Sequence, residues 1–149
     1  SALNVLRIIH FALMTSLLLF GAVITYLHFS ETSSTEVEKD MMVYIPGIIF
    51  LTAVPFSTFM FKKNTAAIKS GPGSLQSKIA TYQTTHIVRM ASFETVGLFA
   101  VVICQITGTL LNLGVLVIVL AYFTIKIPRA SLLETELELS NDEINQLKQ

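Results

Sequence analysis

The sequence predicts an all-α integral membrane protein, a four-helix bundle made of two tandem helical hairpins. Apolar residues make up 52% of the 149 residues and charged residues only 13%, against roughly 25% charged residues in a typical soluble protein. Four apolar stretches approach the length of about 20 residues that crosses a hydrocarbon core as a helix. The basic residues gather in alternate connections between these stretches, which is typical of a polytopic membrane protein.

The predicted spans form a transmembrane domain over residues 1–130. The first apolar run is too long for the core of a signal peptide, and no Ala-x-Ala cleavage pattern follows it. Pro55 and Gly21 fall inside predicted spans, where neighbouring groups can satisfy the freed backbone. A barrel of strands would need short alternating segments with turn signals, which the sequence lacks. The predicted spans cover residues 5–29, 43–61, 86–108 and 110–127.

The charges of the connections predict the orientation in the membrane. Segment 62–89 carries basic residues and no acid, whereas segment 31–42 carries four acids and one lysine. Arg7 precedes the first span, and Lys126 and Arg129 close the fourth. By the positive-inside rule, both termini and the middle connection face the cytoplasm. We expect a bacterial-type protein of the inner, or cytoplasmic, membrane with the lipid bilayer around it.

The middle connection and the tail show further helix signals. Residues 69–74 contain a Gly-Pro-Gly break, and residues 74–85 place apolar side chains at helical spacing, which predicts one long helix leading into the third span. The acidic segment 131–149 contains Ser140 and Glu143 at the spacing of a capping box, which predicts a short helix. We interpret this segment as a solvated cytoplasmic tail; a docking helix for a soluble partner is the alternative.

The two halves of the chain resemble each other. Residues 11–23 align with residues 90–102, and in the second helix of each half Gly47 aligns with Gly114. The two alignments differ in offset by the length of the acidic segment 31–42. The pattern predicts an internal duplication of one hairpin, with that loop inserted in the first copy, as a parallel repeat.

Glu94 is the acidic residue that lies inside an apolar stretch. A carboxylate at this depth costs about 2.5–3.5 kcal/mol on insertion scales, so it indicates a functional site. Its aligned position in the first half is Thr15. We expect the helical face that carries Glu94 to point into the bundle or into an oligomer contact. That face contains Gln83, Met90, Glu94, Gly97, Val101, Gln105 and Gly108.

Two interpretations of Glu94 remain open. In the first, Glu94, Gln105 and Thr95 bind or relay a proton or a cation such as sodium. In the second, a neutral or paired carboxyl locks two helices together, with His10 or Arg89 as its partner. Arg89 precedes Glu94 by five residues, which places the carboxyl about 7.5 Å deeper along a helix.

His10 and His86 form a second candidate group. Both lie at the cytoplasmic ends of predicted spans, and two histidines from separate helices can ligate a b-type haem. Simple interfacial histidines are the competing interpretation, and the sequence favours it over haem. His28 lies at the other end of its span, too far from His10 to share a metal ion. No metal site is predicted.

Other classes of function find little support. The sequence contains no glycine-rich phosphate loop and no nucleophile elbow, so we predict no catalytic residues and do not expect an enzyme. Net charge is zero, which predicts no nucleic-acid partner. The single cysteine, Cys104, excludes an intramolecular disulfide.

The segment from Ala91 to Ile103 reads Ala-Ser-Phe-Glu-Thr-Val-Gly-Leu-Phe-Ala-Val-Val-Ile. It resembles the carboxylate helix of the c subunit, or proteolipid, of rotary ATPases. The doubled hairpin looks like the four-span proteolipids of the vacuolar type. This resemblance implies that Glu94 is a proton- or sodium-binding carboxylate in a ring of copies.

Three functions follow as hypotheses. The first is a homo-oligomeric membrane protein that transports or relays an ion at Glu94. The second is a structural or accessory subunit of a membrane complex with Glu94 in a structural ion pair. The third is a haem protein that uses His10 and His86.

Overall fold

The computed structural model describes residues 2–30, 41–71 and 73–148, and these residues are almost entirely helical, with no strand among them. Most of the predicted acidic loop, residues 31–40, lies outside this described part. The elements are α1 (Ala2–Ser30), a 3₁₀ turn η1 (Met41–Tyr44), α2 (Ile45–Ser70), α3 (Leu75–Thr107), α4 (Leu111–Ile125), α5 (Ala130–Leu137) and α6 (Asn141–Lys148).

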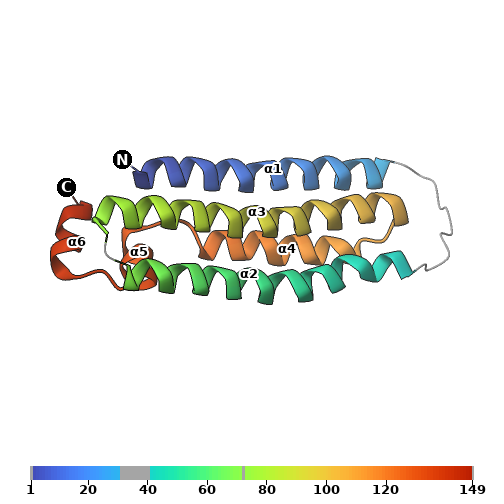
Figure 1. Cartoon of the computed structure of the whole chain (residues 1–149). Helices are drawn as coiled ribbons and strands as arrows, with labels where there is room; N and C mark the ends of the chain where they lie inside the picture. Colours follow the sequence, from blue (N-terminus) through green and yellow to red (C-terminus); the bar gives the residue numbers. More distant parts are fainter. Residues whose placement is uncertain (1, 31–40, 72, 149) are drawn as a thin grey trace.

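Helices α1, α2, α3 and α4 lie lengthwise side by side (Figure 1). Helix α3 contacts the other three along its length. Helices α1 and α3 run away from the end that holds both termini, and α2 and α4 run back towards it. We call this the terminal end; it also holds α5 and α6 (Figure 1). The basic residues of segment 62–89 therefore lie towards one end of the molecule, with Arg7 and Lys126.

Helix α3 is longer than its predicted span, because residues 75–85 form its first turns as one continuous helix. The helix starts where Ser74 caps it, with the Ser74 hydroxyl accepting a bond from the Ser77 backbone N–H at 3.4 Å. It ends at Gly108, whose φ of 65° is a left-handed conformation that glycine adopts without strain. Pro55 lies inside α2 without ending it.

Three helical segments are each long and apolar enough to cross a membrane: α1, η1 with α2, and α3. Helix α4 has only 15 residues. It passes the same test when it is taken together with α5, which follows after a bend of 90°. The structure thus provides three to four candidate spans.

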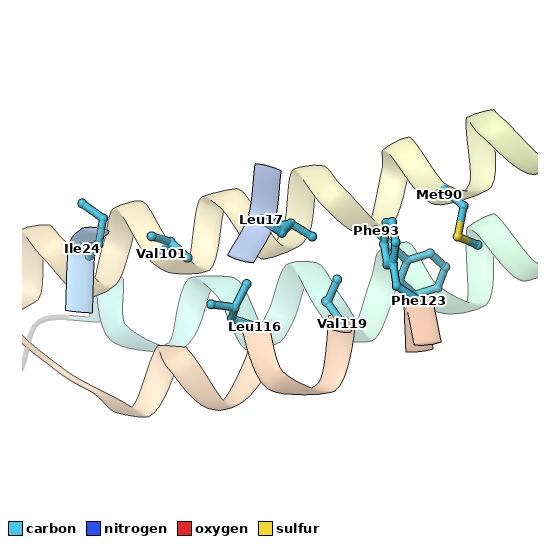
Figure 2. Close-up of a cluster of buried hydrophobic side chains, with 8 residues drawn as sticks. All are labelled: Leu17, Ile24, Met90, Phe93, Val101, Leu116, Val119 and Phe123. Carbon is cyan, nitrogen blue, oxygen red and sulfur yellow. The ribbon is translucent and has the colours of Figure 1, made fainter. Parts of the chain in front are cut away.

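The central core joins α1, α3 and α4, whose apolar side chains meet in one cluster (Figure 2). Two glycines allow this close packing. A Cβ atom added at Gly97 would lie 2.8 Å from the side chain of Leu17, and one at Gly21 would lie 2.6 Å from that of Leu116. The cluster consists of Leu17, Ile24, Met90, Phe93, Val101, Leu116, Val119 and Phe123.

A second apolar cluster attaches the tail to the terminal end. Leu133 of α5 is fully buried, and Leu137 is 4% exposed. They pack with Leu6 of α1, Phe61 of α2 and Tyr82 of α3. The interpretation of this segment as a solvated tail was therefore wrong for α5, because burial of its leucines outweighs the acidic composition of the segment.

Helix α6 begins with the predicted capping box. The Ser140 backbone N–H donates to the Glu143 carboxylate at 2.9 Å, and the Glu143 N–H donates to the Ser140 hydroxyl at 3.4 Å. Lys78 of α3 donates to Glu143 at 2.7 Å, which ties α6 to the bundle. The bond from Lys78 and the bonds from Ser140 lower the pKa of Glu143 to about 2.

Substitution of Gly97 tests the close contact between α1 and α3. We expect Gly97→Ala to unfold more easily than Gly114→Ala by about 1–3 kcal/mol, because the new methyl group overpacks against Leu17. A Cβ atom at Gly114 meets nothing within 4 Å, so this variant controls for the gain in helix propensity. The comparison is made by unfolding the two variants in detergent micelles. Equal stabilities would show that the contact is not tight.

Candidate functional site

Glu94 lies at the edge of the buried face of α3, next to α1. Its carboxylate is partly exposed and accepts a hydrogen bond from the Ser16 hydroxyl at 2.5 Å, a distance found in charge-assisted bonds. No basic side chain in the described part of the chain forms an ion pair with it. The sequence did not indicate Ser16 as a candidate site residue. Neither Arg89 nor His10 is its partner.

The other ion-binding candidates stand apart from Glu94. The Thr95 hydroxyl donates to the carbonyl of Ala91 in its own helix at 2.9 Å, and the Thr95 side chain is exposed. Gln105 lies three turns further along α3 and is partly buried. The predicted face is buried at Met90, Gly97 and Val101, whereas Gly108, at the end of α3, is exposed. Its three polar members, Gln83, Glu94 and Gln105, are only partly buried.

His10, His86 and Arg89 come together in a buried hydrogen-bonded chain at the terminal end, which we call the histidine chain. Arg89 Nη2 lies 3.1 Å from His86 Nδ1, and His86 Nε2 lies 3.5 Å from His10 Nδ1. His10 Nε2 lies 2.9 Å from the carbonyl oxygen of Phe123 in α4. His10 and His86 are each 1% exposed, and Arg89 is 4% exposed.

The groups at the two ends of the histidine chain determine which atom donates and which accepts in each of its hydrogen bonds. A guanidinium only donates and a carbonyl oxygen only accepts. His86 therefore accepts from Arg89 at Nδ1 and donates from Nε2 to His10, which in turn donates from Nε2 to Phe123. Both imidazoles are neutral in this arrangement. An added proton on either ring would put two donors face to face.

The histidine chain bears on the haem hypothesis. All four ring nitrogens of His10 and His86 take part in the bonds just described. The ring centroids of the two histidines are 5.7 Å apart, and the rings of Tyr82 and Phe123 pack against them. This arrangement leaves no nitrogen lone pair for an iron atom. Across the described residues, no three His, Cys, Asp or Glu side chains gather as metal ligands.

Glu136 of α5 accepts bonds from three side chains, two on α3 and one at the end of α4, in a group that we call the Glu136 cluster. The Tyr82 hydroxyl donates to it at 2.6 Å, and Lys126 Nζ donates at 2.9 Å. Arg89 Nη1 lies 3.5 Å from the same carboxylate. The cluster joins α3, the end of α4 and α5, and Arg89 connects it directly to the histidine chain.

Charge compensation explains how these groups tolerate burial. Burial alone raises the pKa of Glu136, but Arg89 and the bonds from Tyr82 and Lys126 outweigh it and hold the pKa below its usual value. The Arg89 guanidinium also lies 3.5 Å over the centre of the Phe61 ring, a cation–π contact. The Nε of Arg89 has no hydrogen-bond partner within the described residues.

Sequence reasoning missed Glu136 because it placed the residue in a solvated tail. One signal was available: Leu133 and Leu137 are four residues apart and form an apolar stripe on a short helix. Nothing in the sequence indicated Arg89 as the partner of Glu136, since 47 positions separate them.

Comparison with known proteins identifies no relative of this chain. A scan against protein-family models and searches of the curated proteins and the solved structures found no match. A proposal for the function therefore rests on the surroundings of Glu94 and on the terminal end, where the histidine chain meets the Glu136 cluster.

Removal of the Glu136 charge tests whether the cluster holds the tail. We expect Glu136→Gln to release α5, because loss of one partner of a buried ion pair costs about 3–5 kcal/mol. Trypsin cleavage after Arg129 should then accelerate by roughly two to four orders of magnitude, since cleavage follows the population of the open form. Glu138→Gln is the matched control, because Glu138 is 73% exposed in its pair with Lys69. Equal cleavage rates for both variants would contradict the assignment.

Proposed function

We propose that this chain is an integral membrane protein that crosses the bilayer four times, with α1 to α4 as its spans. The apolar character of the outer surface supports this. Ile8 of α1 is 68% exposed, Phe59 of α2 is 63% exposed and Val117 of α4 is 62% exposed. Apolar patches of such extent mark membrane or protein contacts rather than water-facing surface.

The short helix α4 can still complete a span. Its 15 residues rise about 22 Å, and the non-helical residues 126–129 extend the chain towards the terminal end. The Pro128 carbonyl in this stretch accepts a bond from Arg7 Nε at 2.9 Å. Irregular backbone is tolerated at the membrane where protein groups satisfy it. Helix and extension together approach the thickness of about 30 Å of a hydrocarbon core.

The proposed orientation places the terminal end in the cytoplasm of a bacterial-type cell, because the basic residues of segment 62–89 belong to that end. The internal duplication is part of the proposal. Gly47 and Gly114, which the alignment pairs, line one cavity of about 290 Å³ between α2 and α4.

Cysteine labelling tests this topology. In a Cys104→Ser background, we expect Lys63→Cys to react with a membrane-impermeant maleimide only in inverted vesicles. Met41→Cys, at the other end of α2, should react from the outside of intact cells lacking an outer membrane. Reaction of both positions from one side would contradict a spanning α2.

We propose that this protein binds or relays a proton or a cation at Glu94. The observation that carries this proposal is the absence of any basic partner for Glu94 in the described part of the chain, beside a bond to the neutral Ser16 hydroxyl. A carboxylate at hydrocarbon depth is stable only if it is protonated, paired or shielded. Arg89 and His10, the expected structural partners, are engaged elsewhere. Glu94 is therefore free to exchange a proton or hold a cation.

The proposal includes contact between copies. Glu94 lies at the outer margin of α1 and α3, next to exposed Thr15, Ser16 and Thr95. Small and polar residues on an exposed helix face favour helix–helix contact within a membrane. A neighbouring copy would shield the carboxyl from lipid and complete the site. The resemblance of residues 91–103 to the proteolipid carboxylate helix implies the same role.

Carbodiimide labelling tests the role of Glu94. The reagent modifies protonated carboxyl groups in apolar surroundings, so we expect Glu94 to carry most of the label in peptide mass spectra. The yield should fall at high pH, and sodium should protect the residue if it binds there. Glu94→Gln should abolish the label, and Glu138→Gln should leave it unchanged. Failure to label Glu94 at every pH would overturn the proposal.

A structural or accessory subunit is the second candidate, and the docked tail favours it. Helix α5 is held by the Glu136 cluster, and α6 is fixed by Lys78. The terminal end thus presents an ordered surface to a partner protein. Under this function, Glu94→Gln leaves assembly and activity of the complex intact, whereas an ion-handling role predicts their loss.

A further inference from the structure

A cavity of about 370 Å³ opens at the terminal end between α2, α4 and α5. Its volume lies within the range of small-ligand sites. Four cationic side chains line it: Lys62, Lys69, Arg89 and Lys126. Glu136 is the acidic side chain among the lining residues. The cavity is therefore strongly cationic, and its chemistry is suited to an anion.

The lining cations are only partly compensated. Arg89 and Lys126 share the single carboxylate of Glu136. Lys69 pairs with Glu138, whose side chain is 73% exposed to solvent. Lys62 forms no ion pair with any acid that the structure describes. Positive charge thus remains after every internal pair is counted.

Arg89 adds a hydrogen-bond argument to the charge argument. Its side chain is 4% exposed, and its Nε–H finds no acceptor among the described residues. A buried donor without a partner is unfavourable by about 1–3 kcal/mol. An anionic oxygen atom bound beside Arg89 would supply the acceptor that its Nε–H lacks.

The position of the cavity distinguishes a lipid from a free anion. Thr58, Lys62, Thr65 and Lys69 line it at spacings of four, three and four residues, so they form one stripe along α2. The same face continues deeper to Leu51, which is 71% exposed. A headgroup in the cavity would place its acyl chains along this apolar part of α2.

We propose that this cavity binds the phosphate of an anionic phospholipid headgroup. Basic pockets between membrane helices on the cytoplasmic side bind such headgroups through lysine and arginine. The unpartnered Arg89 Nε–H and the lysines would supply the phosphate contacts, with Lys62 free of any ion pair among the described residues, and the threonine side chains would lie beside the glycerol part. The inference rests on the proposed membrane location but not on the role of Glu94.

Lipid binding to the detergent-purified protein tests the proposal. The probes are short-chain phosphatidylglycerol, short-chain phosphatidylcholine and inorganic phosphate, each followed by native mass spectrometry. We expect phosphatidylglycerol to bind more tightly than phosphatidylcholine, and Lys62→Gln to weaken it about fivefold, the effect of one lysine near an anionic surface. Lys63→Gln is the matched control, since Lys63 is adjacent but does not line the cavity.

Each other outcome overturns the inference. Equal losses in both variants would indicate diffuse attraction to a basic surface. Equal binding of the two lipids would remove the anionic specificity. Binding of inorganic phosphate alone would identify a free anion as the ligand. Lipid binding is measured on the purified protein in detergent. A negative result there is therefore independent of the carbodiimide labelling of Glu94 and of the cysteine-labelling test of topology.

Discussion

The buried positive charge of Arg89 is the constraint on which the terminal end of the molecule depends. A guanidinium that is 4% exposed needs charge compensation and acceptors. It obtains them from three directions: the Glu136 carboxylate, the His86 ring and the face of Phe61. These contacts belong to α5, α3 and α2. A single side chain on the central helix therefore determines where the tail docks and how the helix ends are arranged.

The histidine chain extends this constraint to the remaining helices. Because Arg89 can only donate, it sets the tautomer of His86, which sets that of His10 and directs its N–H to the Phe123 carbonyl in α4. Helices α1, α3 and α4 are thus linked by one directional series of bonds, next to the apolar cluster of Figure 2. The histidines satisfy one another's polar groups in a region that excludes water. Their burial follows from this pairing and requires no bound metal or haem.

Hydropathy and charge spacing predicted the helical class, the continuous third helix and the capping box of α6, because each depends on neighbours within about one or two helical turns. The partners of the charged groups were not predictable in this way. Glu94 and Ser16 are 78 positions apart, and Arg89 and Glu136 are 47 positions apart. In one of the two interpretations of Glu94, Arg89 or His10 was its expected partner, and Arg89 was chosen for its proximity in sequence. Three-dimensional packing instead offered it a carboxylate from the folded-back tail.

The two carboxylates differ in how many donors depend on their negative charge. Glu136 accepts bonds from Tyr82, Lys126 and Arg89, so its negative charge is needed to keep three donors satisfied. Protonation there would leave Arg89 as an uncompensated buried charge. Glu94 accepts one bond from a neutral hydroxyl, and its protonation strands no cation. Arg89, the cation nearest to Glu94 in sequence, pairs with Glu136 instead, so under the proposed function a change of charge at Glu94 would leave the contacts at the helix ends in place.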